Sequence, residues 1–240
     1  MRREAGTGRR AVITGAAGTI GRELVVAFRE AGYEVIATDQ GEGDWISLDL
    51  TDAEAIARFC AWTEGPIHAL VNNAGIASWD KPVEETTTAE FDRVIAVNLR
   101  APFLMVKGFL PKFAPDAAVV NVASLRWKMT DDHNEPYSAS KGGLYGLTQA
   151  MAVSLGRSHG LRLNTISPGW IVPEGESVRP EDDAIHPLGR VGRAPDIAGA
   201  ALYLCDPGSG FVTGTDLIVD GGMQRVMAYP PESSPPPESE

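Results

Sequence analysis

The sequence predicts an α/β fold of the doubly wound type, in which a central parallel sheet of about seven strands carries helices on both faces. Three observations predict it. Short apolar runs typical of buried strands alternate with longer helical patterns along most of the 240 residues. Hydrophobic residues make up 43% of the chain, which is enough for a large core. The first apolar run leads directly into a glycine-rich turn and a helical pattern, "AVITGAAGTIGREL".

The expected elements follow one another regularly. Strands are expected at 10–15, 34–38, 45–48, 68–72, 117–123, 161–167 and 215–219, and helices at 19–31, 52–62, 88–111, 137–159 and 195–205. Such an alternation builds right-handed βαβ units. No linker interrupts it, so residues 1–228 are expected to form one domain.

Two segments of the chain lack a clear period. Residues 170–190 carry three prolines and several charges, which predicts a lid over a substrate site. Residues 229–240 are rich in Pro, Ser and Glu, which predicts a flexible tail or one held by a partner subunit.

Composition excludes several classes of function. The chain has 21 basic and 32 acidic residues and a net charge of −11, which disfavours nucleic acid and anionic membranes as partners. No uninterrupted apolar run approaches the roughly 18–20 residues of a transmembrane helix, and no apolar signal-peptide stretch follows the basic N-terminus. Cys60 and Cys205 are expected to be buried, unreactive thiols, and no ligand cluster predicts a metal. We therefore expect a soluble cytoplasmic protein.

The glycine-rich turn predicts a dinucleotide site and hence a Rossmann fold. Gly15, Gly18 and Gly21 follow the first strand, where glycines permit a sharp turn and close approach of a pyrophosphate. Thr19 and Ile20 open the next helix, whose N-terminus presents free N–H groups to phosphate. The three glycines are evenly spaced, which departs from the commonest form of this turn.

The end of the second strand predicts which dinucleotide binds. Asp39 lies 18 residues after Gly21, where a carboxylate accepts hydrogen bonds from both ribose hydroxyls and repels a 2′-phosphate. No cation lies beside it, so NAD is favoured over NADP. Asp49 follows the third strand with Leu50, and its carboxylate is expected at the adenine amino group. The other reading of Asp49 is a helix cap.

A third group of residues predicts proton transfer. Tyr137 and Lys141 lie four residues apart on one helical face. A lysine cation close to a phenol favours the phenolate and lowers its pKa from about 10. Ser124 ends the fifth strand, where its hydroxyl can hold a substrate oxygen against the tyrosine. Asn98 interrupts a helical pattern, where it can disturb the backbone hydrogen bonds and hold a water.

Taken together, these motifs resemble the short-chain dehydrogenase/reductase family over almost the full chain, in its compact single-domain branch. The matching pieces are "TGAAGTIG", "NNAG", Asn98, Ser124, "YSASK", "SPGWI" and the closing "HPLGRVGRAPDIAGAALYLCDPGSGFVTGTDLIVDGG". The resemblance implies reversible hydride transfer between NAD(H) and an alcohol or carbonyl carbon.

The resemblance also implies roles for individual residues. Tyr137 would be the general acid/base, Lys141 would bind the nicotinamide ribose and lower the tyrosine pKa, and Ser124 would polarise the substrate carbonyl. Asn98 would hold a water in a proton relay to Lys141. Further cofactor contacts would come from Asn73, Ala74 and Gly75 beside the adenine ribose, and from Pro168, Gly169 and Ile171 around the nicotinamide. The resemblance also implies a homotetramer or homodimer, with helices 88–111 and 137–159 at one interface and the last strand at another.

One position departs from the family pattern. Pro173 stands where many members have a threonine whose hydroxyl meets the nicotinamide carboxamide, and proline offers neither hydroxyl nor N–H. Nicotinamide anchoring is then expected to depend on Ile171 and the 174–190 segment.

The substrate pocket is expected to be polar. Between the serine and the tyrosine, "LRWKMTDDHNEP" carries Arg126 and His133, and Trp79 and Trp170 could add stacking walls. Such groups suit a sugar, polyol or hydroxy acid. The other reading is a solvated loop.

Two other functions stay open. One is an epimerase or dehydratase of the family's larger branch, which uses the same glycine spacing but needs a substrate domain after the sixth strand. The other is a dinucleotide-binding scaffold without catalysis, which typically lacks the tyrosine, lysine or serine.

Overall fold

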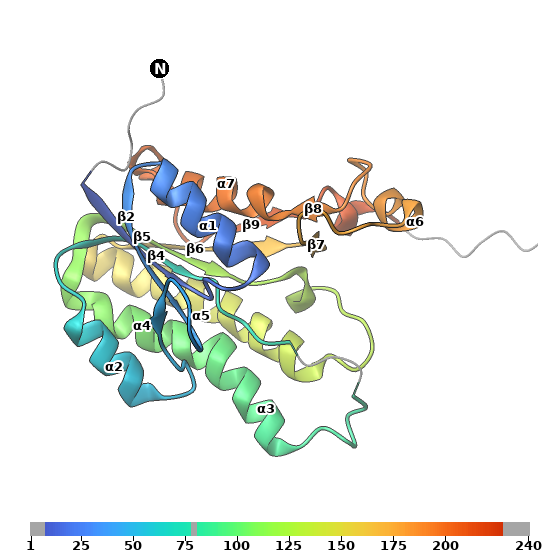
Figure 1. The fold of residues 1–240 in the computed structure, drawn as a ribbon, viewed down its shortest axis with the longest axis horizontal. Helices are drawn as coiled ribbons and strands as arrows, with labels where there is room; N and C mark the ends of the chain where they lie inside the picture. The colour runs from blue at the N-terminus through green and yellow to red at the C-terminus, as the bar shows by residue number, and fades with distance from the viewer. Residues whose placement is uncertain (1–7, 78–80, 228–240) are drawn as a thin grey trace, which may run out of the picture.

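The computed structural model describes residues 8–77 and 81–227, and a seven-stranded parallel sheet forms its centre (Figure 1). The strand order is β3-β2-β1-β4-β5-β6-β9. The strands are β1 (Arg9–Thr14), β2 (Tyr33–Asp39), β3 (Ile46–Ser47), β4 (Ile67–Asn72), β5 (Phe113–Val122), β6 (Arg162–Pro168) and β9 (Asp216–Val219). All seven correspond to predicted strands, so the predicted doubly wound Rossmann fold is confirmed.

Helices cover both faces of this sheet. On one face lie α1 (Thr19–Glu30) and α7 (Ala194–Cys205), and on the other lie α2 (Ala53–Trp62), α4 (Ala101–Phe109) and α5 (Glu135–His159), with α3 (Thr88–Ile95) beside α5 (Figure 1). Neighbouring side chains of a strand point to opposite faces. Val12 of β1 accordingly joins the core under α2 and α4, whereas Ile13 joins the core under α1 and α7.

The order of the strands places the functional site. The chain runs outward from β1 to β2 and β3, then returns to the other side of β1 with β4. In open α/β sheets a ligand binds at the carboxyl ends of the strands where the order reverses. Here that point lies between β1 and β4, directly after Thr14 and Asn72.

The predicted helix over 88–111 is divided into α3, a π-helical turn, α4 and the start of a 3-10 turn, η2 (Leu110–Lys112). A π-helical turn, η1 (Ala96–Arg100), separates α3 from α4, and Asn98 lies at its centre. This confirms the expected disturbance of the backbone at Asn98. A wider turn of this kind typically marks a functional site.

The structure also differs from prediction in 170–190 and at the start of α5. The former contains β7 (Ile171–Val172), which pairs with β8 (Gly192–Arg193), and the short helix α6 (Pro180–Ala184). These elements are too short to produce a sequence period. Helix α5 begins at Glu135, two residues before the predicted start, because Pro136 is well suited to a first helical turn.

Residues Thr88–Lys112 are long and apolar enough to cross a membrane by length and composition, with a mean hydropathy of 1.3. The expectation that no stretch would approach this was too strict. Half of the stretch is buried within the protein, and Met105 and Phe109 are fully buried in the core. This is the behaviour of a core helix.

The two cysteines are buried as predicted. Cys60 and Cys205 are both free, and burial raises the pKa of each thiol to about 12. Both thiols are therefore protonated and unreactive at neutral pH.

Candidate active site

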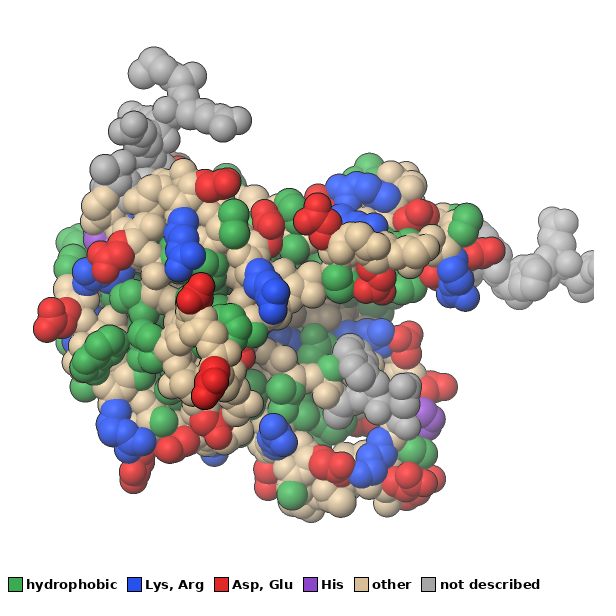
Figure 2. Space-filling model, in the orientation of Figure 1, with side chains coloured by type: hydrophobic (Ala, Val, Ile, Leu, Met, Phe, Trp, Pro, Cys, Tyr) green, Lys and Arg blue, Asp and Glu red, His purple; other side chains and the backbone are tan. Residues whose placement is uncertain are grey.

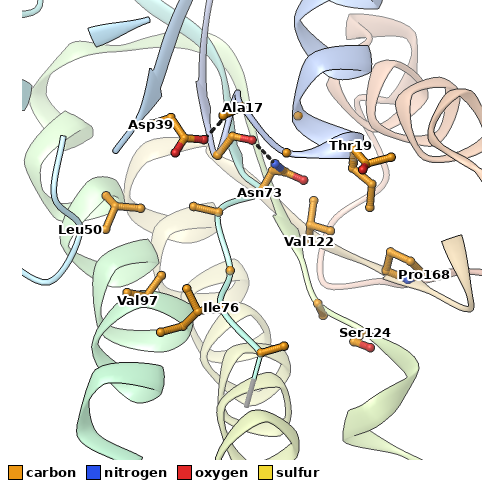
Figure 3. Close-up of a pocket in the computed structure, with 18 of the residues that line it drawn as sticks. Ala17, Thr19, Asp39, Leu50, Asn73, Ile76, Val97, Val122, Ser124 and Pro168 are labelled. Carbon is orange, nitrogen blue, oxygen red and sulfur yellow. Dashed lines mark hydrogen bonds between the residues drawn. The ribbon is translucent and has the colours of Figure 1, made fainter. Parts of the chain in front are cut away.

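A cavity of about 750 Å³ opens over the carboxyl ends of β1, β4, β5 and β6 (Figure 3). On the molecular surface a hollow lies below the segment that carries β7, α6 and β8 (Figure 2). The lining brings together most of the predicted site: Gly15, Gly18, Thr19, Ile20, Gly21, Asp39, Leu50, Asn73, Ala74, Gly75, Ser124, Tyr137, Lys141, Pro168, Gly169 and Ile171. Asn98 lies buried directly behind it.

The glycines of the turn are not equivalent. Gly15 has a φ of +72°, and a Cβ there would lie 2.7 Å from the Ala74 Cα. A Cβ on Gly21 would lie 1.8 Å from the Gly15 carbonyl oxygen, which is impossible without moving α1. Gly18 is different, because its Cβ would meet only the Gly15 oxygen at 3.5 Å, an ordinary contact. Gly15 and Gly21 are therefore required by the close packing of β1, α1 and β4, and Gly18 is not.

Gly18 is also the N-cap of α1, and no side chain caps the helix there. The first N–H groups of α1 therefore lack a capping side chain where Thr19 and Ile20 line the cavity. This is the geometry that binds a phosphate or pyrophosphate.

Asp39 is fixed at the end of β2 by two backbone amides. Its Oδ2 accepts a hydrogen bond from the Ala17 N–H at 2.8 Å (Figure 3). Its Oδ1 accepts one from the Gln40 N–H at 2.6 Å. The carboxylate thus joins the glycine turn to β2 and still has lone pairs facing the cavity that it lines.

Asn73 fixes the other side of the turn. Its side-chain amide donates to the carbonyls of Thr14 at 3.0 Å and Gly15 at 3.1 Å. The Thr14 hydroxyl in turn accepts hydrogen bonds from the backbone N–H groups of Asn73 and Ala74, both at 3.1 Å. Sequence reasoning missed Thr14, although a threonine that ends an apolar strand immediately before a glycine was a usable signal.

The geometry gives less support to the predicted contact of Asp49 with the adenine of the cofactor. Asp49 does not line the cavity, and its Oδ1 accepts hydrogen bonds from the Thr51 N–H and hydroxyl, both at 2.8 Å. Those bonds hold the pKa of Asp49 below its usual range. Asp52, not Asp49, caps α2. The adenine contact of Asp49 stays a prediction. The predicted residue Leu50 does line the cavity, together with Leu48, Arg93 and Val97, which were not predicted.

Ser124 and Tyr137 meet at the other end of the cavity. Ser124 follows β5, and Tyr137 lies in the first turn of α5. Burial is the largest effect and raises the pKa of Tyr137 above its usual value, although a hydrogen bond with Ser124 and the positive charge of Arg126 partly oppose it.

Lys141 is buried one helical turn beyond Tyr137. Its Nζ donates to the Val122 carbonyl at 2.8 Å and lies 5.4 Å from the centre of the Tyr137 ring. Burial lowers the pKa of Lys141 to about 8. The expected effect of this lysine on the tyrosine pKa stays a prediction.

Asn98 connects the π-helical turn to the site. Its Oδ1 accepts from the Ile76 N–H at 2.9 Å, and its Nδ2 donates to the Ile76 carbonyl at 2.9 Å and to Ser140 Oγ at 3.0 Å. A Cβ on Gly75 would lie 3.4 Å from Lys141 Nζ and 3.6 Å from Asn98 Oδ1. Because residue 75 is a glycine, space remains beside Lys141 Nζ and Asn98 Oδ1. We predict that a water molecule fills this space.

A buried chain of amides supports α5 from below. The Asn72 Nδ2 donates to Asn121 Oδ1 at 2.8 Å, and the Asn121 Nδ2 donates to Thr148 Oγ1 at 2.8 Å. These two hydrogen bonds connect β4, β5 and α5 and hold α5 against the sheet. Sequence reasoning missed them, although an asparagine inside an apolar strand was the available signal.

The predicted substrate residues are less well grouped. The positive charge of Arg126 lowers the pKa of Tyr137, but Arg126 forms an ion pair with Asp131 and does not line the cavity. His133 is exposed with a φ of +59°, and Trp170 is 41% exposed, and neither lines the cavity. Trp79 lies outside the described residues. Much of 128–133 is therefore a solvated loop, which was the other reading of this polar segment.

Pro173 forms a hydrogen bond through its backbone carbonyl. The Arg193 Nη1 donates to this carbonyl and so joins the segment after β7 to β8. No hydroxyl replaces the threonine expected at this position.

The sequence matches known oxidoreductases along most of its length. Residues 15–224 match a family model described as Enoyl-(Acyl carrier protein) reductase. An uncharacterized oxidoreductase of Thermotoga maritima is 35% identical over 92% of this chain and 98% of its own. The cis-4-hydroxycyclohexanecarboxylate dehydrogenase of Sinomonas cyclohexanicum is 33% identical, with 93% and 99% covered. The gluconate 5-dehydrogenase of Gluconobacter oxydans is 31% identical, with 90% and 95% covered.

Solved structures agree with these matches. A short-chain dehydrogenase/reductase of Brucella melitensis, described as a glucose/ribitol dehydrogenase, superposes with a TM-score of 0.83 at 32% identity and covers 93% of this chain and 99% of its own. A blue fluorescent protein from a metagenomic library, solved in complex with NADPH, superposes with a TM-score of 0.82 at 27% identity, with 90% and 98% covered.

Proposed function

The chain belongs to the short-chain dehydrogenase/reductase family and is an oxidoreductase of that type, and on this premise we propose that it transfers a hydride between NAD(H) and the alcohol or carbonyl carbon of a small polar substrate. One observation carries the proposal. Ser124, Tyr137 and Lys141 converge at one end of a cavity whose other end has the geometry of a pyrophosphate site. A nicotinamide cofactor supplies the hydride acceptor or donor when bound.

The residues around the cavity fit such a cofactor. The close approach of Gly15 to Ala74 leaves no room for a side chain there, and the N-terminal N–H groups of α1 lie beside it. Asp39 would hold the ribose hydroxyls, and Pro168, Gly169 and Ile171 would border the nicotinamide. Asn73 would act through the glycine turn that it fixes.

The chain's own side chains would handle the proton. In the oxidation direction, Tyr137 as a phenolate removes the hydroxyl proton of the substrate while the carbon loses a hydride, and the resulting carbonyl oxygen accepts a hydrogen bond from Ser124. Reduction runs the same steps backwards. Lys141 and the water expected beside Gly75 and Asn98 would return the proton to solvent.

The other two functions are less well supported. An epimerase or dehydratase of the larger branch needs a substrate domain after the sixth strand, but the described residues after β6 form only α6, α7, β9 and short connecting elements. A scaffold without catalysis would not need to bring Ser124, Tyr137 and Lys141 together.

A single substitution tests the chemistry. Tyr137→Phe removes the proton-transfer hydroxyl and keeps the ring, so we expect turnover to fall at least about 1,000-fold. NADH binding, followed by fluorescence titration, should change less than about threefold. Retained turnover would refute the assigned role of Tyr137.

The choice of NAD over NADP rests on Asp39. Two observations compete with it, since one similar structure holds NADPH and Arg93 lines the same cavity. We expect the wild type to prefer NAD and Asp39→Ala to lower the ratio of kcat/KM for NAD to that for NADP at least about tenfold. A wild-type preference for NADP that Arg93→Ala abolishes would show that Arg93 binds a 2′-phosphate instead.

The substrate class is supported from two sides. The names of two relatives state that they act on cis-4-hydroxycyclohexanecarboxylate and on gluconate, and a similar structure is described as a glucose/ribitol dehydrogenase. The charged side chain of Arg126, two residues after Ser124, lowers the pKa of Tyr137. A sugar, polyol or hydroxy acid is therefore the proposed substrate, acted on in the cytoplasm.

A further inference from the structure

A second cavity, of about 550 Å³, adjoins the first one. Its lining includes Asp49 and Thr51, from the connection between β3 and α2, together with residues of α3 and η1. Gln40 and Arg93 line both cavities. The two spaces therefore meet at these two side chains, and Asp49, which was predicted at the adenine, lines only the second.

Arg93 carries a positive charge that other described side chains do not pair. Its guanidinium forms no hydrogen bond or ion pair within residues 8–77 and 81–227. The other cations that line the two cavities are held by backbone carbonyls. Lys141 Nζ donates to the Val122 carbonyl at 2.8 Å, and Arg100 Nη2 donates to the Thr51 carbonyl at 2.7 Å. Arg93 is thus the cation of this described lining that is available to a ligand.

Arg93 lies beside an apolar wall of the first cavity. Arg93 in α3 and Val97 in η1 are four residues apart, which places both side chains on one helical face, and both line that cavity. Leu48 and Leu50, which flank Asp49 in the sequence, line it too. All three apolar residues are buried. Apolar side chains beside a planar cation suit a flat aromatic ring, because a guanidinium stacks on the face of such a ring.

This part of the cavity lies away from the reaction centre. Figure 3 shows Asp39, Leu50 and Val97 on one side of the view and Ser124 on the other. Carboxylates are present here, since Asp39 lines the first cavity and Asp49 lines the second. They would repel an additional phosphate dianion, whereas the neutral ring of adenine would not be repelled.

We propose that Arg93 binds the adenine ring of the cofactor, through contact of its guanidinium with the face of the ring. This inference rests on the proposed function, because it takes a nicotinamide dinucleotide to be the occupant of the first cavity. Arg93 then strengthens the binding of NAD and NADP by the same factor, and the choice between them stays with Asp39. Arg93 acts on the affinity for the cofactor and not on the transfer of the hydride or the proton.

Calorimetric titration with AMP tests this contact directly, because AMP holds the adenine but neither the nicotinamide nor a 2′-phosphate. Arg93→Gln should raise the Kd for AMP at least about fivefold. Arg93→Lys keeps the charge but not the planar group, and it should give an intermediate Kd. Adenosine 2′,5′-bisphosphate should lose affinity by the same factor as AMP in Arg93→Gln. A loss confined to the bisphosphate would overturn the inference, because it would mean that Arg93 binds a 2′-phosphate.

Two analogues separate the ring from the other groups of the cofactor. Reduced nicotinamide mononucleotide has a phosphate but no adenine, so Arg93→Gln should change its Kd, followed by its fluorescence, less than about twofold. The hypoxanthine analogue of NADH keeps an aromatic ring without the amino group, so its affinity should fall by the same factor as that of NADH. Equal losses for the mononucleotide and AMP would mean that Arg93 attracts phosphate. A loss for NADH but not for its analogue would mean that Arg93 acts through Asp49 on the amino group, and either result would refute the assignment.

Arg58→Gln is the matched control. Arg58 is exposed on α2 and lines neither cavity, so the removal of the same charge there should leave the Kd for AMP within about twofold of the wild type. The titrations need no turnover. If the wild type binds AMP and NADH but turns over no substrate, the proposed function fails, and the titration with AMP still decides the role of Arg93. Unchanged affinity for AMP in Arg93→Gln, or no binding of AMP by the wild type, would count against that role.

Discussion

The buried side chain of Lys141 in the active site lowers the stability of the folded protein. Lys141 is nearly inaccessible to solvent, and burial lowers its pKa from 10.5 to about 8. In the unfolded chain the lysine would stay protonated up to its ordinary pKa of 10.5. The charged lysine therefore weakens the folded state at neutral pH, and this cost disappears as the pH rises from about 8 to 10.5.

Because charged Lys141 lowers the free energy of unfolding, removing its charge should raise it. Lys141→Met keeps the length of the side chain and removes the charge. The shift corresponds to about 3 kcal/mol, and loss of the hydrogen bond to the Val122 carbonyl takes back about 1 kcal/mol. We expect the free energy of unfolding at pH 7 to rise by about 2 kcal/mol, with turnover abolished.

Urea unfolding at pH 7 and pH 10 checks this prediction. The gain should be largest at pH 7 and shrink towards pH 10. Lys107→Met is the control, since Lys107 is exposed on α4 and its removal should show no such dependence on pH. The same change at both pH values would mean that the charge of Lys141 does not weaken the fold.

At the scale of elements, the turn between β1 and α1 explains the unusual glycine spacing. Gly15 is required for its positive φ and its approach to Ala74, and Gly21 is required because α1 lies against the Gly15 carbonyl. Gly18 needs neither property. The spacing is thus compatible with a dinucleotide turn of ordinary geometry, in which Thr19 begins the helix.

The element-scale prediction compares two alanine substitutions. Gly18→Ala should change the free energy of unfolding by less than about 1 kcal/mol, because its Cβ makes only an ordinary contact. Gly21→Ala must displace α1 from β1 and should cost at least about 3 kcal/mol and most of the affinity for NADH. Thermal unfolding with and without NADH measures both effects, and equal losses would contradict the assigned difference.

The elements also show what a sequence can and cannot predict. The apolar runs predicted seven strands correctly, because a buried parallel strand must be apolar on both faces. The motifs predicted that Ser124, Tyr137 and Lys141 lie near the glycine turn. In contrast, the Thr14 bonds and the Asn72–Asn121–Thr148 hydrogen bonds depend on partners far away in sequence. The pairing of β7 with β8 was missed for the same reason.

At the scale of the whole molecule, several apolar side chains are exposed, and two of the surfaces that carry them are formed by regular elements of the fold. Phe103 on α4 is 42% exposed and Val153 on α5 is 56% exposed. Strand β9 forms one edge of the sheet and is only partly buried, and Phe211, which precedes it, is fully exposed. We propose that these two surfaces, α4 with α5 and β9 with its neighbours, are interfaces of a homotetramer.

Light scattering after size-exclusion chromatography tests the assembly. The wild type should have about four times the 25.6 kDa of one chain. Val153→Glu places a charge in one interface only, so about half that mass is expected. Val26→Glu is the control, because Val26 is 48% exposed on α1, which covers the face of the sheet opposite α4 and α5, and the mass of this variant should not change. A wild-type monomer would refute the proposal.

The strand order has a consequence for how the protein becomes functional after synthesis. Strand β1 pairs with β2 and also with β4, and the cavity further needs β5 and β6. Contacts between distant parts of a chain form slowly, because long loops must close first. The cofactor pocket is therefore a late product of folding, and the recovery of NADH binding during refolding should follow the slowest phase.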